Sequence, residues 1–129
     1  MILVWYAQWE HDCCGDEFSI GDRVDWALSR HEVDVEYLTA LLGADLTAQV
    51  GAVRMEHEEP PLPRVQGVVT RIRRVSCRER LLEDGVSLVR VGGTTVLRDV
   101  ATAPRFPDDR HDPGGPLHAR GHLVALDLA

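Results

Sequence analysis

Hydrophobic and polar residues alternate with a period of two in several short segments of the chain. The clearest case follows Gly21-Asp22, where Val24, Trp26 and Leu28 alternate with polar or small residues. This period is typical of a β-strand with one buried face. Glycine and aspartate accept backbone angles that other residues resist, so Gly21-Asp22 predicts a turn or bulge before the strand. Residues 18–28 are therefore predicted to form a bent strand of a small β protein.

The same pattern predicts seven short strands and one short helix. The helix covers residues 34–42, where hydrophobic residues recur at helical spacing, with Ser29 or Asp34 as N-cap and Gly43 as C-cap. One further helical turn is predicted over 79–83, and Gly92-Gly93 predicts a two-residue hairpin between two strands. The predicted strands are residues 2–8, 18–28, 47–56, 65–75, 86–91, 94–100 and 122–128.

Three segments between these elements are predicted to be loops. Residues 9–17 are polar, residues 57–63 contain three prolines, and residues 103–116 contain four prolines and a Pro-Gly-Gly run. Because the strands do not alternate with full-length helices, a parallel α/β fold is disfavoured. We predict a mainly β fold, a single domain over 1–129 that forms a small antiparallel, partly closed barrel, OB-like or SH3-like. Residues 103–116 would form a Pro/Gly-rich surface loop within it.

Length and composition are those of one soluble globular domain. The chain has 129 residues, of which 44% are hydrophobic and 27% are charged. Residues 1–7 are apolar but too short to span a bilayer, and no basic residue precedes them as in a signal peptide. The three cysteines show no disulfide-framework spacing. These features predict a cytoplasmic protein without a membrane segment, and they leave its oligomeric state open.

The charge of the chain is unevenly distributed. The formal net charge of −7 disfavours binding to nucleic acid or to an anionic membrane. Residues 64–80 contain six arginines and one acid, which leaves −12 on the rest of the chain. Because arginine suits phosphate and carboxylate groups, Arg71, Arg73, Arg74 and Arg78 are candidate binding residues for a small anionic ligand. The alternative, which we favour, is that acidic residues of the same chain neutralise these arginines.

Cysteine and histidine residues form a second candidate site. Cys13 and Cys14 lie beside His11, and zinc prefers thiolate and imidazole ligands. His57 and Cys77 would complete the set from elsewhere in the chain. Adjacent cysteines of an extended segment point apart, however, so the simpler interpretation has one of them buried as a small hydrophobic residue and the other partly exposed. No cofactor is predicted, and zinc bound by these residues is the alternative.

The same cysteines are the basis of an enzyme hypothesis. A nucleophilic cysteine needs a thiol pKa that is lowered by a nearby cation or helix N-terminus. Asp12, Asp16 and Glu17 surround Cys13 and Cys14 in the sequence, and their negative charge is expected to raise the thiol pKa. Catalysis is therefore not the favoured interpretation, and no catalytic residue is assigned.

Three groups of residues carry a resemblance to a known family. They are Trp5, Trp9, Cys13-Cys14-Gly15, Phe18, Gly21, Val24, Trp26 and Leu28; then Val65-x-Gly67-Val-Val, Ile72 and Cys77; and the terminal Gly121-His-Leu-Val-Ala-Leu-Asp. On these residues the chain resembles a family of small actinobacterial proteins that is known only as a domain of unknown function. The resemblance covers most of the chain, and its most specific element is the pair of cysteines before Gly15. It implies a single compact domain and no particular activity.

The sequence supports three functional hypotheses of different classes. The favoured one is a non-enzymatic β-barrel module that binds a partner protein or a small anionic ligand, because the arginines are segregated and no acid–base constellation is present. The first alternative is a cysteine- or metal-dependent enzyme that uses the Cys13-Cys14 segment. The second is a module that binds single-stranded nucleic acid, which the net charge disfavours.

Overall fold

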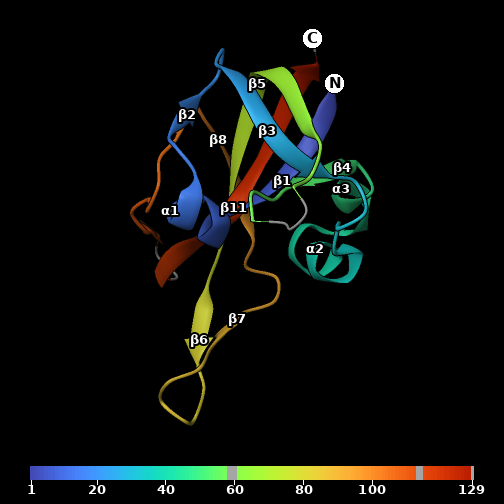
Figure 1. The fold of residues 1–129 in the computed structure, drawn as a ribbon. Coiled ribbons are helices and arrows are strands. Elements are labelled where there is room, and N and C mark those ends of the chain that lie inside the picture. Colours follow the sequence, from blue (N-terminus) through green and yellow to red (C-terminus); the bar gives the residue numbers. More distant parts are fainter. Residues whose placement is uncertain (58–60, 113–114, 129) are drawn as a thin grey trace.

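Two long strands run through the centre of the structure, β5 (Arg64–Cys77) and β11 (Gly115–Leu128). The computed structural model describes residues 1–57, 61–112 and 115–128. Figure 1 shows that the protein is mainly β, as predicted, with small helices beside the strands. The other elements are β1 (Ile2–Ala7), α1 (Gln8–Cys14), β2 (Phe18–Ser19), β3 (Arg23–Ser29), α2 (Val35–Leu42), α3 (Ala44–Thr47), β4 (Val50–Arg54), β6 (Glu79–Leu81), β7 (Leu88–Arg90), β8 (Val96–Val100), β9 (Thr102–Ala103) and β10 (Arg110–Asp112).

Five of the strands pair in a ring. β11 pairs with β1, β1 with β4, β4 with β3 and β3 with β5, and β5 pairs back with β11. The length of β5 makes this closure possible. One edge of β5 pairs with β11 over residues 67–77, and its other edge is shared by β3 and β8. Within the ring the β1–β4 pair is parallel, and the other four pairs are antiparallel.

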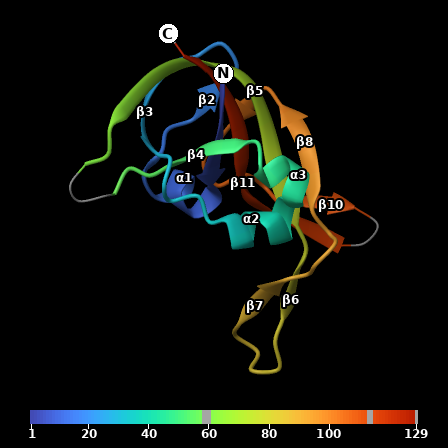
Figure 2. The ribbon, with the colours of Figure 1, turned by 90° about the vertical axis from the view of Figure 1, so that its right-hand side faces the viewer.

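Smaller elements surround the ring. β6 and β7 form a hairpin that projects away from it in both views (Figures 1 and 2). Figure 2 shows α2 and α3 next to each other on one side of the ring. Leu38 and Leu41 of α2 are buried there in a cluster with Leu3 and Trp5 of β1. α2 therefore covers the outer face of the ring at β1.

β1 is buried on both faces, as its apolar sequence predicts. Ile2, Val4 and Tyr6 belong to a buried cluster that draws on all five strands of the ring and therefore fills its interior. Leu3 and Trp5 belong to the second cluster, against α2. Successive side chains of a strand point to opposite faces, so this one strand separates the two cores.

The helix predicted over 34–42 is present as α2. The Asp34 side chain accepts a hydrogen bond from the Tyr37 N–H at 3.0 Å, and the Gly43 N–H donates to the Thr39 carbonyl at 2.9 Å. Gly43 has a φ of 89°, in the region that favours glycine. The two capping residues therefore set the ends of α2 as the sequence predicts. In the described part of the chain, none of the helices has the length and apolar character needed to cross a membrane.

The predicted sheet is wrong in three respects. The arrangement is not wholly antiparallel, because β1 and β4 are parallel. The strands are more numerous than seven, and three helices rather than one lie in the described residues. The additional strands β2, β6, β9 and β10 are two or three residues long, which is too short to leave a periodic pattern in the sequence.

Several local predictions are also wrong. The segment 9–17, predicted as a loop, contains most of α1, and the segment 79–83, predicted as a helical turn, begins with β6. Gly92-Gly93 lie in a turn, but the strands beside it do not pair with each other: β7 pairs with β6, and β8 with β5. A strand's partner depends on the whole sheet, which a two-residue turn signal does not report.

Part of the segment 103–116, predicted as a loop, is strand. β10 lies within it and β11 begins at Gly115, and the two strands pair antiparallel. Residues 113–114 lie outside the described residues, as do residues 58–60 of the predicted connector 57–63.

Candidate functional site

α1 presents two adjacent thiols to solvent. The helix follows β1 directly, and the Gly15 N–H closes it by donating to the His11 carbonyl at 3.0 Å. Its last two residues, Cys13 and Cys14, are both exposed. In a helix successive side chains are about 100° apart, whereas in an extended chain they point to opposite faces. The sequence-based argument that the two thiols diverge as in an extended segment therefore does not apply.

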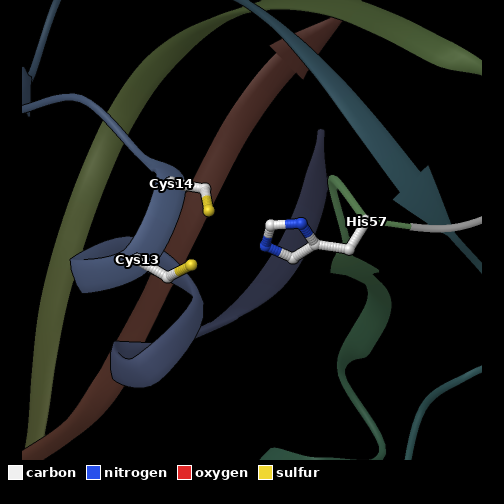
Figure 3. A group of neighbouring side chains, drawn as sticks. All are labelled: Cys13, Cys14 and His57. Carbon is white, nitrogen blue, oxygen red and sulfur yellow. The ribbon is translucent and has the colours of Figure 1, made fainter.

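The parallel pairing of β1 and β4 brings His57 to these thiols. Parallel strands end at the same edge of a sheet, so the segments that follow β1 and β4 begin side by side. One candidate ligand atom from each of Cys13, Cys14 and His57 lies within 4.8 Å of the other two. Figure 3 shows both sulfurs and the imidazole ring turned toward the space between α1 and the segment after β4. We call these three side chains the thiol–imidazole cluster.

A buried carboxylate lies beside the cluster. Glu10 Oε1 is 3.7 Å from His57 Nε2 and accepts a hydrogen bond from the Glu56 N–H at 2.8 Å. The Glu10 side chain is only 3% exposed. Glu10 precedes Cys13 by three residues and Cys14 by four, a spacing that places side chains on one face of a helix. Glu10 is therefore positioned by both α1 and His57.

The other two predicted metal ligands, His11 and Cys77, lie elsewhere and are buried. His11 Nδ1 is 3.2 Å from the Tyr6 hydroxyl, and its Nε2 is 2.9 Å from the Ala103 carbonyl. Burial lowers the pKa of His11, so the neutral imidazole is favoured inside the core. Cys77 packs in the cluster between α2 and the ring, where burial raises the pKa of its thiol. In the structure both residues pack within the protein core.

The Cys14 thiol lacks the lowered pKa that a cysteine nucleophile needs. The pKa of Cys14 is raised, chiefly by a hydrogen bond with Cys13, then by desolvation and by the charges of Cys13 and Glu10. A catalytic cysteine is instead activated by a lowered pKa. The electrostatics around Cys14 therefore give no support to the enzyme hypothesis.

A groove of about 700 Å³ adjoins the cluster and shares Glu10 with it. It lies between α1, α2 and the end of β4. Its walls combine aromatic rings with carboxylates, and Trp9 at its edge is 66% exposed although it is a large apolar side chain. The lining residues with aromatic or charged side chains are Trp5, Trp9, Tyr37, Glu10, Asp12, Glu32, Asp34, Arg54 and Arg120.

The two arginines of the groove are already paired with carboxylates outside its lining. Arg54 Nε is 3.0 Å from Glu56 Oε1, and its guanidinium stacks 4.5 Å from the ring centroids of Tyr6 and Trp26. Arg120 donates to Glu79 Oε1 at 3.0 Å. The four lining carboxylates therefore give the groove a negative character. The sequence analysis missed this groove, because the helical spacing that groups its residues in α1 lies in a segment that was predicted to be a loop.

The four arginines predicted to bind an anion have different surroundings in the structure. Arg71 donates to both carboxylate oxygens of Asp99, at 2.8 and 3.2 Å. Arg74 donates instead to His122 Nε2 at 3.3 Å. Arg73 is half-buried, and burial followed by the charge of Arg71 lowers its pKa. Arg78 comes directly after β5, and its N–H donates to the Thr94 hydroxyl at 3.0 Å.

Arg71 provides a test of internal neutralisation. We expect Arg71→Ala to change the free energy of unfolding only slightly, because the Arg71–Asp99 pair is more than half exposed. Phosphate should then shift the melting temperatures of the wild type and the variant equally, since Asp99 rather than a dissolved anion neutralises Arg71. This expectation would be contradicted if phosphate raised the melting temperature of the wild type in a saturable way and Arg71→Ala abolished the rise.

Comparison with known proteins identifies a family for almost the whole chain. A model of a family of unknown function, DUF6578, matches residues 1–128. No curated protein and no solved structure gives a significant match.

Proposed function

Because the chain belongs to the DUF6578 family, whose function is unknown, we propose a function from the geometry of the site. The protein is a non-enzymatic binding module, and its groove holds an arginine or lysine side chain of a partner protein. We also propose that the ring of five strands is a small closed barrel, of which the groove occupies the outer side. The pairing of β5 with both β3 and β11 supports this closure.

The observation that carries the proposal is the composition of the groove. An exposed indole beside carboxylates is the arrangement that binds organic cations, since the ring face attracts the charge and the carboxylates accept its hydrogen bonds. Trp9 provides the ring, and Glu32 and Asp12 are carboxylates of the same groove. The arginines of the groove do not compete for these acids, because each has its own carboxylate.

The other sequence-based hypotheses have less support from the geometry. An anionic ligand would need the arginines of β5 to converge, whereas Arg71 and Arg74 bind different partners. A nucleic acid that stacked on the exposed Trp9 ring would meet the carboxylates of the same groove. A binding module for a basic protein segment is therefore the best supported function.

Selection from a library of short immobilised peptides tests the proposal. The wild type is expected to enrich sequences that contain arginine or lysine. In a selected peptide that contains arginine, replacing the arginine by citrulline, its neutral isostere, should weaken binding by about tenfold or more. The reason is that the charge-assisted hydrogen bonds and the cation–π contact are lost. Binding should also weaken as salt is raised, since the groove carboxylates of Glu32 and Asp34 are exposed to solvent.

Matched variants link this binding to the groove. Trp9→Ala and Glu32→Gln alter exposed lining residues and are expected to weaken binding without a change in the fold. Phe106→Ala removes an equally exposed ring, 68% against 66%, outside the groove lining and should have no effect. Enrichment of acidic peptides, or equal binding by Trp9→Ala and wild type, would contradict the proposal.

A further inference from the structure

We propose that Cys13, Cys14 and His57 bind Zn²⁺, with the Glu10 carboxylate as the fourth ligand. This inference does not require the groove hypothesis, because three of the four proposed ligands lie outside the groove lining and Glu10 is the one residue that belongs to both sites. It assigns a structural rather than a catalytic ion, since four protein ligands leave no open position for a substrate.

The donor set suits zinc in particular. Two thiolates and an imidazole are soft or borderline ligands, which select Zn²⁺ over Mg²⁺ and Ca²⁺. In a tetrahedral site with Zn–S bonds of about 2.3 Å, two sulfurs are about 3.8 Å apart. The ligand atoms of Cys13, Cys14 and His57 lie within 4.8 Å of one another, so rotations of exposed side chains are sufficient to close the site.

Glu10 supplies the second reason to place a cation here. A buried carboxylate is costly unless a positive charge or hydrogen bonds compensate it. The structure shows Glu10 with one backbone N–H donor, from Glu56, and with the His57 imidazole at 3.7 Å. Glu10 Oε1 is near His57 Nε2 but is not among the atoms that lie within 4.8 Å of one another, so the Glu10 side chain has to approach the ion when it binds. The ion would neutralise this carboxylate together with the two thiolates.

The arrangement also explains how two adjacent cysteines act on one ion. Spacings of two to four residues are usual because they allow both sulfurs to converge. Here Cys13 and Cys14 occupy the last turn of α1, and the helix brings their side chains to the same side as Glu10. His57 then closes the site from the segment after β4, as Figure 3 shows.

Metal titration of the full chain, kept reduced with a phosphine, tests the site. Zn²⁺ should bind at one equivalent in competition with a chromophoric chelator and should raise the melting temperature by linkage. Co²⁺, used as a probe in place of Zn²⁺, should show tetrahedral ligand-field bands and a sulfur-to-cobalt charge-transfer band. Each of Cys13→Ser, Cys14→Ser and His57→Gln should weaken Zn²⁺ binding by more than about tenfold, and each cysteine variant should reduce the charge-transfer band.

Matched variants outside the site complete the experiment. Cys77→Ala removes the buried thiol, and His31→Gln removes an exposed imidazole far along the chain from the cluster; both should bind Zn²⁺ as the wild type does.

Glu10→Gln tests the fourth ligand. It keeps the side-chain shape and should weaken Zn²⁺ binding by about tenfold. Circular dichroism verifies that each variant is folded. The proposal is overturned if the wild type binds no Zn²⁺, if Cys13→Ser and Cys14→Ser bind as tightly as wild type, or if Glu10→Gln has no effect.

Discussion

Replacing Trp26 by alanine is expected to lower the free energy of unfolding by about 3–5 kcal/mol. The indole is 4% exposed and packs inside the ring, with its centroid 5.0 Å from the Phe18 ring and 5.7 Å from the Tyr6 ring. The Arg54 guanidinium also stacks on it at 4.5 Å. Truncation therefore leaves a cavity beside these two aromatic rings of the core and removes a cation–π contact.

Chemical denaturation of Trp26→Ala and of Asp25→Ala measures this effect against a neighbouring control. Asp25 lies on the opposite face of β3, and its carboxylate pairs with Arg64 at 3.4 Å in an exposed ion pair. Asp25→Ala should therefore lower the free energy of unfolding by less than about 1 kcal/mol. Equal denaturation midpoints for the two variants would show that the faces of β3 are assigned wrongly.

Lowering the pH from 7 to 5 is expected to reduce the free energy of unfolding by about 2 kcal/mol through His122 alone. Burial, followed by the nearby charges of Arg74 and His11, lowers the pKa of His122 to about 3. In the unfolded chain its pKa is the ordinary 6.5. Below pH 6.5 the unfolded chain binds a proton that the folded protein does not bind until about pH 3. Stability is therefore fully present above pH 6.5 and is lost progressively as the pH falls toward 3.

The structure shows why the folded protein excludes this proton. His122 is fully buried, and its Nε2 accepts a hydrogen bond from Arg74 Nε at 3.3 Å, so an added proton would face a guanidinium. Denaturation at pH 7 and pH 5 measures the change. Between pH 7 and pH 5, the free energy of unfolding of His122→Gln should decrease less than that of the wild type. The decrease that remains in this variant should come partly from His11, whose pKa is also lowered. His31→Gln, at an exposed position, should show the same decrease in the free energy of unfolding between pH 7 and pH 5 as the wild type. A wild type equally stable at both pH values would contradict the assignment.

Glu10 connects the two sites. It lines the groove and lies 3.7 Å from His57 of the thiol–imidazole cluster. The two proposals remain separable, because Trp9→Ala and Glu32→Gln alter the groove alone and the cysteine variants alter the cluster alone. Peptide binding that changes when Zn²⁺ is added would show that Glu10 couples the two sites.

The sequence by itself determined those features that depend on near neighbours in the chain. α2 was predictable because Asp34 and Gly43 cap it, and hydrogen bonds across three or four residues are sufficient to stop a helix at both ends. The burial of Trp26 was predictable because alternation along one strand fixes which side chains share a face. The apolar sequence of β1 likewise predicted burial on both faces.

The tertiary structure decided the rest, and the reason is the pairing of strands that lie far apart in the chain. His57 meets Cys13 and Cys14 because β4 returns beside β1 in a parallel pair, which places the two segments that follow them at one edge. α1 itself is too short to be stable alone, so contacts with the ring select helix where polar residues suggest a loop. His11 and Cys77 were also candidate ligands in the sequence, but His11 on α1 and Cys77 at the end of β5 are both buried in the core, away from the cluster.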